Sequence, residues 1–520
     1  MKKISTRIVL GLCTFALLLS SCSDELDTTP KVELSLENLL AKDPTAIEGL
    51  LSKMYGTFAL SGSKGSGSSD ITGPDPGETA FLRSIINLQE FTADGMKNRW
   101  GDDGLDQLTT SSRWDANNKF FRYLYDRVYY IVPQSTNIIL ALNSVDVANE
   151  EQIVSELRFI RALSYYYMID CFGKGVIVND ANYGSVAPLK ESTRTELFEF
   201  VEKELLDVES KIALTNTYGR ANKSVVRMLL AKLYLNAQVY TGTARYNDAL
   251  IYVNKVINEG NYQLADNFVS LFSGDNNAPI NQKNEIIFPL IADAVTSQSF
   301  GNTTYIVNGS VSTETMNINQ FGSTDGWTGH RATKAWYGLF GNLGTSTDDR
   351  AKLFWTTNHN YEMTDYKEWK DGYPSVKFRN TNFSGSSLST SFSSTDFPLF
   401  RLADAYLMYA ECVARGAAGG DATQALTYVN NVRQRSNAAV ITSAQLTLDF
   451  ILDERARELN LEGHRRTDLI RFGKFTGGSY LWPWKGNALN GASIPDTYRV
   501  FPIPQSALQA NTNLSQNTGY

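Results

Sequence analysis

Cysteine and histidine are scarce in this chain, with four cysteines and three histidines among 520 residues. A tetrahedral zinc site takes its ligands from these residue types at short spacings, and no such spacing occurs here. Cys171 and Cys412 are far apart in the sequence and lie in apolar, helix-like contexts. A lone cysteine in such a context usually packs as a small hydrophobic residue. The sequence therefore predicts no zinc site and does not favour a disulfide between these two residues.

Positive charge is also in short supply. The chain has 48 Lys and Arg against 55 Asp and Glu, a net charge of −7. Residues 1–21 hold three of the positive charges and no acid, so the rest of the chain has 45 against 55, a net charge of −10. A surface of that sign repels phosphate backbones, and we expect no nucleic-acid partner. The sequence also lacks a G-x-S-x-G motif, a P-loop and a dinucleotide fingerprint, so none of these enzyme classes is indicated.

The N-terminus has the pattern of a secretion signal. Lys2, Lys3 and Arg7 precede a short apolar stretch at 8–19, which is too short to span a membrane comfortably. The stretch ends in Leu-Ser-Ser-Cys at 19–22, a pattern typical of bacterial lipoproteins. We therefore expect a signal peptide over 1–21 and lipidation of Cys22. The alternative is an ordinary signal peptide followed by an incidental cysteine.

One long apolar stretch is expected to organise the fold. Residues 156–173 contain no proline, and glycine occurs only at the last position. Apolar and aromatic side chains fall on every side of a helix drawn through them, including Tyr165, Tyr166 and Tyr167. This pattern predicts a helix that is buried on most of its faces, in which the tyrosines belong to the core rather than to a ligand site.

The rest of the chain alternates between helical and loop-rich stretches. Small alanines with tyrosines alongside are similar to tetratricopeptide helix pairs of about 34 residues, which bury one another by stacking. We expect a mainly α fold with few short strands, a helix over 120–142 interrupted at Pro133, and a strand-like run around Tyr305. Residues 22–520 are expected to form a single composite unit. Its helical scaffold is predicted at about 35–60, 78–91, 120–265 and 397–475, and its loop-rich, ligand-binding portion at about 61–115, 266–396 and 476–520.

A cluster of titratable residues near the end of the scaffold raises an enzymatic alternative, since paired carboxylates can hydrolyse glycosidic bonds. Its members are Glu454, Glu458, Glu462, His464 and Asp468. The carboxylates alternate with arginines, which favours ion pairs between packed helices. His464 is not part of an H-E-x-x-H motif. We expect no enzyme.

An oxygen-rich loop at 275–277 (Asp-Asn-Asn) offers the hard ligands that Ca²⁺ prefers. A solvated polar loop has the same composition. The sequence predicts no cofactor, and a structural calcium ion at this loop is kept as an alternative.

Five blocks in order then point to a family. The blocks are residues 156–173, FPLFRLADAYLMYAEC at 397–412, ILDERARELNLEGHRRTDLIRFGKF at 451–475, FPIP at 501–504 and NLSQNTGY at 513–520. The chain resembles the SusD/RagB family along nearly its whole mature length. Further segments are most similar to a starch-binding member of that family: GPDPGETAFLR at 73–83, YLNAQVYTG at 234–242, TTYIVNG at 303–309, TDGW at 324–327 and LWPWKGNALNG at 481–491.

The resemblance implies a lipid-anchored protein at the cell surface of the outer membrane, built on a tetratricopeptide-like scaffold. It implies non-catalytic binding of starch or a related α-glucan, polysaccharide or oligosaccharide, and a SusC-like TonB-dependent transporter as partner. It also implies a site in which an arc of three aromatic rings cradles the glucan. The matching positions are Trp100, Tyr305 and Trp327 for the arc, and Asp75, Arg83 and Asp103 for polar contacts, with Asp103 in place of an asparagine.

Alternatives remain for these residues and for the function. Tyr305 could belong to the core, and Arg83 could form a surface ion pair with Asp75 or Glu78. The same family membership is compatible with another glycan or a peptide as ligand. A third reading is an interaction module that caps the transporter and has no glycan site of its own.

Overall fold

The computed structural model describes residues 35–277, 284–388 and 390–520. The predicted signal peptide and Cys22 lie outside the described residues. The described chain is mainly helical, with three separate two-stranded sheets, as the sequence predicts. None of the described helices combines the length and the apolar character needed to cross a membrane.

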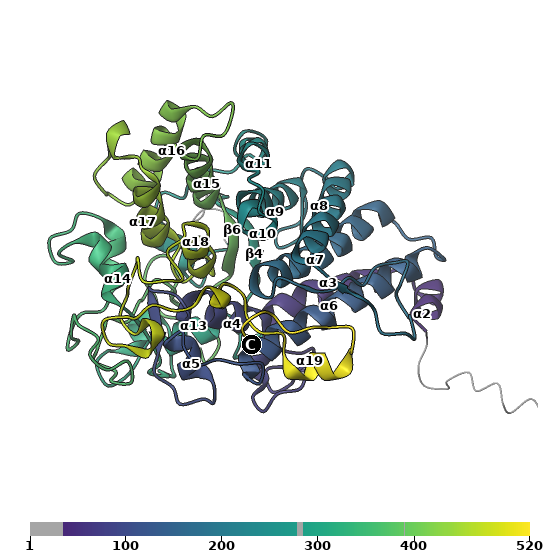
Figure 1. Ribbon diagram of the computed structural model, residues 1–520, viewed down its shortest axis with the longest axis horizontal. Coiled ribbons are helices and arrows are strands. Elements are labelled where there is room, and N and C mark those ends of the chain that lie inside the picture. Colours follow the sequence, from purple (N-terminus) through teal and green to yellow (C-terminus); the bar gives the residue numbers. More distant parts are fainter. Residues whose placement is uncertain (1–34, 278–283, 389) are drawn as a thin grey trace, which may run out of the picture.

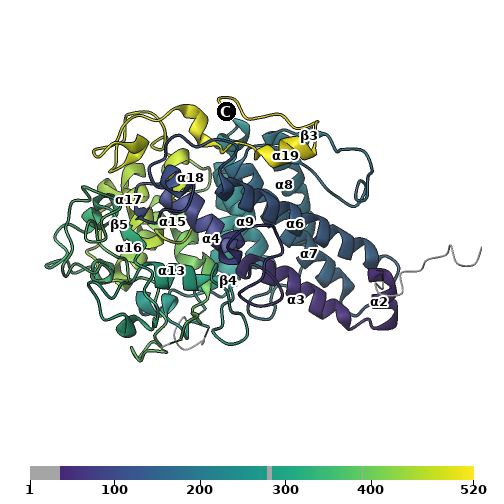
Figure 2. The same cartoon turned by 90° about the horizontal axis from the view of Figure 1, so that it is seen from below.

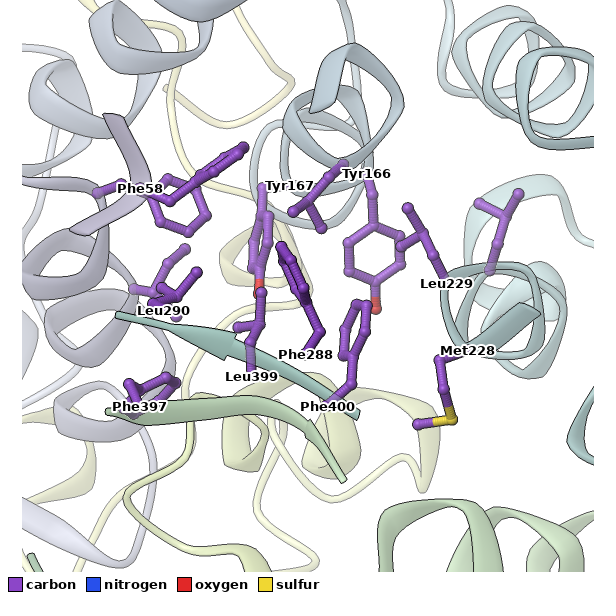
Figure 3. Packing of buried hydrophobic residues seen from close by; sticks show 14 of the residues in the cluster. Phe58, Tyr166, Tyr167, Met228, Leu229, Phe288, Leu290, Phe397, Leu399 and Phe400 are labelled. Atoms are coloured by element: carbon purple, nitrogen blue, oxygen red, sulfur yellow. The ribbon is translucent and has the colours of Figure 1, made fainter. Parts of the chain in front are cut away.

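The long apolar stretch forms helix α7, Glu150–Cys171, and nearly every side chain from position 155 onwards is buried. Tyr165, Tyr166 and Tyr167 are at most 5% exposed. Figure 3 shows Tyr166 and Tyr167 pointing towards two strands, β4 (Ile286–Leu290) and β6 (Phe397–Arg401). The prediction that the tyrosines belong to the core is confirmed.

Successive helices stack on α7 from both sides. Contacts connect α6 with α7, α7 with α8, α8 with α9, α9 with α11, α11 with α15 and α15 with α16. This nearest-neighbour order is consistent with a helical-repeat scaffold. The stack consists of α6 (Lys119–Leu142), α8 (Arg194–Lys211), α9 (Lys223–Leu235), α10 (Ala237–Thr241), α11 (Tyr246–Glu259), α15 (Leu402–Ala414) and α16 (Ala422–Arg435).

Several helices start where the sequence supplies a cap. Thr193 and Glu196 form a capping box at the start of α8, in which each side chain accepts a hydrogen bond from the other's backbone N–H. Asn222 caps α9 by accepting a hydrogen bond from the backbone N–H of Val225. Local sequence therefore sets these helix boundaries.

Two expectations about the helical scaffold are wrong. Helix α6 runs without interruption through Pro133, because one missing N–H donor does not outweigh the burial of the helix on its neighbours. The scaffold segment predicted at about 397–475 begins with strand β6, which pairs antiparallel with β4, and becomes helical only after Arg401. That pairing connects segments more than 100 residues apart, so local pattern does not reveal it.

The remaining elements flank this stack. Near the N-terminus lie α2 (Leu36–Lys42), α3 (Ala46–Ala59), η2 (Pro76–Thr79), α4 (Phe81–Ile86), η3 (Asn87–Phe91), β1 (Met96–Asn98) and α5 (Leu105–Thr109). The sheet of β2 (Gly175–Val176) and β3 (Glu191–Ser192) follows α7. The C-terminal part contains η8 (Ser443–Gln445), α17 (Leu448–Leu459), α18 (Arg465–Arg471), η9 (Lys485–Asn487), η10 (Asp496–Arg499) and α19 (Gln505–Ala510).

The loop-rich segment between β4 and β6 lies on the side of the molecule opposite α2 and α3 (Figures 1 and 2). Just before β4 lies η4 (Phe268–Phe272). The described part of the segment between β4 and β6 contains only short elements: α13 (Thr303–Gly309), η5 (Ile318–Phe321), β5 (His330–Ala332), α14 (Lys334–Tyr337), η6 (Gly338–Phe340) and η7 (Asp349–Leu353). Strand β5 pairs antiparallel with β1, so Asn98 faces His330 and Met96 faces Ala332. This short ladder joins the loop-rich segment to the N-terminal part of the chain.

Candidate functional site

A hollow of about 690 Å³ opens at one end of the β1/β5 ladder. Its walls come from the segment before η2, from α4, from the loop after β1, and from the residues before α13 and β5. The lining residues are Asp75, Arg83, Trp100, Gly101, Asp102, Phe300, Asp325 and Trp327. Four of the six sequence-predicted site residues, Asp75, Arg83, Trp100 and Trp327, are therefore brought together although up to 252 positions separate them.

Trp100 is fixed in place by the loop before β5. Its indole Nε1 donates a hydrogen bond of 3.0 Å to the backbone oxygen of Trp327, and its backbone N–H donates one of 2.9 Å to Asn98 Oδ1. A side chain at Gly329 would place its Cβ 2.5 Å from the Trp100 ring. Glycine is required there because the ring lies directly against the backbone. Trp100 is thus a rigid, partly exposed platform.

The aromatic wall curves from Trp100 through Trp327 to Phe300. The ring centroids of Trp100 and Trp327 are 6.2 Å apart with planes tilted by 55°. Those of Trp327 and Phe300 are 6.1 Å apart with a tilt of 48°. The Trp327 indole donates to Asp325 Oδ2 at 2.8 Å, and Phe300 is 37% exposed. Because the three rings line one hollow, they form a concave apolar surface.

Tyr305 does not have the position expected of it. It lies in helix α13 rather than in a strand, and its side chain is fully buried. Its hydroxyl donates to Asn87 Oδ1 at 2.6 Å, and burial raises the pKa of Tyr305. A ring with no exposed face cannot stack on a ligand, so Tyr305 supports the site from behind. Phe300 is the third ring that lines the hollow.

Arg83 lies between this support and the hollow. Its guanidinium stacks on the Tyr305 ring at 4.4 Å from the ring centroid, and the residue is 6% exposed. Its ion pairs are long, 3.5 Å to Asp75 and 3.8 Å to Glu78, and its Nε has no hydrogen-bond partner among the described residues. A buried guanidinium with incompletely used donors is suited to receive a hydroxyl from a ligand. The alternative reading, an ion pair with Asp75 or Glu78, is thus present in the structure, although the guanidinium itself is buried.

The two predicted acids differ in position. Asp75 lines the hollow with a side chain that is 48% exposed, and its Oδ1 accepts a hydrogen bond from Gly77 N at 2.8 Å. Asp103 is exposed but does not line the hollow, and its neighbour Asp102 does. Asp102 is therefore the acid of this loop that lines the hollow, and a ligand contact by Asp103 stays a prediction.

His330 packs behind the aromatic residues of the hollow. Its ring is fully buried, 5.1 Å from Trp100, 4.7 Å from Tyr305 and 4.9 Å from Phe91 by ring centroid. Burial, followed by the nearby positive charges of Arg83 and Arg331, holds its pKa well below the usual value. A neutral imidazole whose two nitrogens have no partner among the described residues acts as an apolar packing group.

Sequence reasoning missed Asp102, Phe300 and Asp325. Asp102 and Asp325 lie two residues from the predicted tryptophans, and the TDGW segment already contained Asp325. Phe300 precedes Asn302, which caps α13 through its side chain. That cap was the available signal that residues 303–309 are helical, and the sequence held no signal that Phe300 faces the hollow.

The carboxylate cluster of α17 and α18 forms ion pairs. Glu458 contacts Arg350 at 2.8 Å, Arg401 at 2.6 Å and also Arg435, and it is fully buried. Glu454 is similarly surrounded by three arginines, and their positive charges overcome desolvation to lower its pKa to about 2. Such carboxylates remain ionised and paired, as the sequence predicts, and are not general acids.

Cys171 and Cys412 are buried free thiols, and burial raises the pKa of each. No grouping of His, Cys, Asp and Glu suited to a metal occurs within 35–277, 284–388 and 390–520. At the predicted calcium loop, the Asn276 amide donates to the backbone oxygens of Leu271 and Asp396, and Asp275 Oδ1 accepts a hydrogen bond from Phe383 N. The calcium alternative stays a prediction.

Known proteins resemble this chain in sequence. The family model described as the SusD family matches residues 352–520. The starch-binding protein SusD of Bacteroides thetaiotaomicron is 34% identical over 521 residues, which cover 91% of this chain and 92% of that protein. A SusD-like protein of Bacteroides ovatus is 22% identical over 90% of this chain and 82% of its own length.

Solved structures resemble its fold. A surface glycan-binding protein A from Bacteroides thetaiotaomicron, solved in complex with laminarihexaose, has a TM-score of 0.69 at 21% identity, covering 91% of this chain and 99% of that chain. A SusD superfamily protein from Parabacteroides distasonis has a TM-score of 0.70 at 19% identity, covering 92% and 99%. These likenesses match the mainly helical architecture described above.

Proposed function

The chain belongs to the SusD family, and on that premise we propose that it binds starch or a related α-glucan at the hollow of Trp100, Trp327 and Phe300. Membership of this family makes the chain a SusD-like glycan-binding protein rather than an enzyme. The proposal goes further in naming the glycan and the site.

The observation that carries the proposal is the curvature of the aromatic wall. A pyranose has C–H-rich faces that aromatic rings can bury and hydroxyls that need polar partners. The three rings line one hollow with tilts of 55° and 48° between neighbours, so the wall is concave. A helical α-glucan presents a convex outer face that such a wall can follow, whereas a flat, extended glycan would touch one ring at a time. The 34% identity to a starch-binding protein supports the same choice.

Polar groups at the rim complete the expected recognition. Asp75, Asp102 and Asp325 offer carboxylate oxygens as acceptors, and Arg83 offers donors. Each ring that removes ~50 Å² of apolar sugar surface contributes about 1.2 kcal/mol. Three rings and several hydrogen bonds, set against the cost of association, lead to a dissociation constant of roughly 10 µM to 1 mM. A polymer with many epitopes compensates for weak single contacts.

We further propose the setting in which this binding acts. The sequence pattern at 1–22 supports a lipid anchor at Cys22, and family membership supports placement at the outer-membrane surface next to a SusC-like TonB-dependent transporter. In this setting the protein delivers bound glucan to the transporter. Copurification of a TonB-dependent transporter with the lipidated chain is the expected result, and a lipidated chain that never copurifies with one would contradict this part.

A second candidate function keeps the family and changes the glycan. The observation in its favour is that the third ring lining the hollow is Phe300 and not the expected Tyr305, which is buried. Calorimetric titration of the purified chain with soluble starch, pullulan, laminarin and dextran separates the two. Binding to starch and pullulan supports the α-1,4-glucan proposal. Binding to laminarin or dextran without any starch signal would replace it with the second candidate.

A further inference from the structure

A second hollow of about 540 Å³ lies on the loop-rich side, beyond α14, which is at the left edge of Figure 1. The loop after η6 forms one wall, and residues 351–356, 361 and 373 form the other. The lining residues are Gly341, Asn342, Leu343, Gly344, Ala351, Lys352, Phe354, Thr356, Tyr361 and Tyr373. None of them lines the first hollow.

Two tyrosine rings dominate this second hollow. Tyr361 is 44% exposed and Tyr373 is partly exposed, with ring centroids 6.1 Å apart and planes at 74°. Both pack against the buried ring of Tyr337, at 5.0 Å and 4.5 Å. The Tyr337 hydroxyl donates to the backbone oxygen of Tyr361. The rings are therefore held from behind, so little freedom is lost when a ligand stacks on them.

The polar groups of this hollow suit an uncharged ligand with hydroxyls. Lys352 is the one charged residue among those that line it, and its ammonium pairs with Asp349 at 2.6 Å. The side-chain oxygen of Asn342 accepts a 2.9 Å hydrogen bond from Gly344 N, and its amide nitrogen is a donor for a ligand. The exposed Thr356 offers a hydroxyl. Aromatic faces beside neutral donors and acceptors match a pyranose better than an ion or a charged peptide.

The second hollow is tied to the same ladder as the first. Tyr373 and Ala332 exchange backbone hydrogen bonds of 2.8 Å and 3.3 Å, which places Tyr373 beside the end of β5. The opposite end of β5 is His330, which lies beneath Trp100. One short, paired strand thus connects the two aromatic hollows rigidly.

We propose that the hollow of Tyr361 and Tyr373 is a second carbohydrate subsite that binds a pyranose unit of the polysaccharide recognised at Trp100 and Trp327. This inference rests on the proposed function in assuming a glycan ligand. A second, weaker contact increases retention of a polymer while adding little to the affinity for a short oligosaccharide.

Affinity electrophoresis of the purified chain in gels containing soluble starch, pullulan, laminarin or dextran tests the proposal. Tyr361→Ala removes an exposed ring and is expected to weaken binding of the polymer that the wild type binds by about three- to tenfold. Tyr361→Phe keeps the ring and is expected to bind as the wild type does. Thr356→Arg fills the hollow from an exposed position and is expected to weaken binding as Tyr361→Ala does. Because this substitution is on the surface and should leave the fold intact, weaker binding by both variants would not be explained by unfolding of Tyr361→Ala. Tyr183→Ala, at a tyrosine that is 38% exposed elsewhere, is the matched control and should change nothing.

The pattern of results separates the two proposals. If Tyr361→Ala and Thr356→Arg are both retarded as strongly as the wild type while Trp327→Ala is not retarded, the second subsite is overturned and the first site stands. Loss in the Tyr361 and Thr356 variants with no effect of Trp327→Ala supports the second subsite and contradicts the first. A wild-type chain retarded by none of the four polysaccharides contradicts both.

Discussion

The indole nitrogen of Trp100 donates a 3.0 Å hydrogen bond to the backbone oxygen of Trp327, which lies 227 residues further along the chain. This contact joins the loop after β1 to the loop before β5 and sets the angle between two rings of the aromatic wall. The wall is therefore part of the fold and does not depend on a ligand to assemble it. Preassembled rings lower the cost of ordering the site on binding.

The fit between Gly329 and the Trp100 ring provides a direct test of this arrangement. Gly329→Ala would introduce a Cβ at 2.5 Å from the ring, so the ring must shift. We expect weaker glucan binding with the helical content of the protein unchanged, measured by calorimetry and circular dichroism. Gly49→Ala, whose Cβ would meet nothing within 4 Å, is the control and should bind normally. Normal binding by Gly329→Ala would show that the ring's position does not matter.

Arg83 should contribute hydrogen bonds to the glycan rather than stability alone. Arg83→Met keeps an apolar stem over Tyr305 but removes the donors. A hydrogen bond to a charged group contributes about 1.5–3 kcal/mol, so affinity should fall by at least about tenfold. Titration with maltoheptaose measures this. An unchanged dissociation constant would assign Arg83 a packing role only.

Glu458 should matter for stability and not for binding. Glu458→Gln removes the buried carboxylate that Arg350, Arg401 and Arg435 share, and the buried network loses one negative charge. Loss of one partner in a buried ionic network typically costs about 3–5 kcal/mol, so the urea midpoint of unfolding should fall clearly. Glu37→Gln, on an exposed carboxylate of α2, is the control. Starch binding by folded Glu458→Gln at low urea should equal that of the wild type, whereas a selective loss of binding would revive a functional role for the cluster.

Burial of Glu90 predicts a pH dependence of stability. Desolvation raises the pKa of Glu90 to about 7, against 4.5 for the ordinary group, even though Gly463 N and His464 N donate to its Oε1. Between these values the folded chain binds more protons than the unfolded chain, so the contribution of Glu90 to stability falls as pH rises from about 4.5 to about 7. Glu90→Gln has no carboxyl at this position, so it does not undergo this fall in stability as pH rises.

Urea unfolding at pH 5 and pH 8 measures the difference. The free energy of unfolding of Glu90→Gln relative to wild type should increase by up to about 3 kcal/mol between the two values, because one pKa unit corresponds to about 1.4 kcal/mol. Taking the difference between the two proteins cancels the other titrating groups that they share. A difference that is constant with pH would show that Glu90 titrates near its ordinary value.

The sequence predicts the helical scaffold well because its signals are local. The apolar stretch at 156–173 is helical up to Cys171, where α7 ends, and Thr193 supplies the cap at which α8 begins. Helix periodicity and caps depend on neighbours within a few positions. Pro133 and β6 were mispredicted because packing and a long-range strand partner determine them.

The site could be predicted only in part, for a related reason. Trp100 and Trp327 stand out as aromatics in polar loops, and the structure places them together. Tyr305 and Phe300 are both aromatic and five residues apart, and only the helical turn of α13 decides which is buried and which is exposed. The choice between Asp102 and Asp103 depends on one loop conformation in the same way. Similarity between sequences indicates which positions carry the residue types of a site, but the fold determines which of those side chains face the hollow.

The most direct test of the account is the electrophoretic mobility of Trp327→Ala in gels with and without soluble starch, compared with wild type and with Tyr183→Ala. We expect starch to retard the wild type and Tyr183→Ala alike, and Trp327→Ala to migrate as it does without starch. Retardation of Trp327→Ala equal to that of the wild type would contradict the assignment of the glucan site to the hollow of Trp100, Trp327 and Phe300.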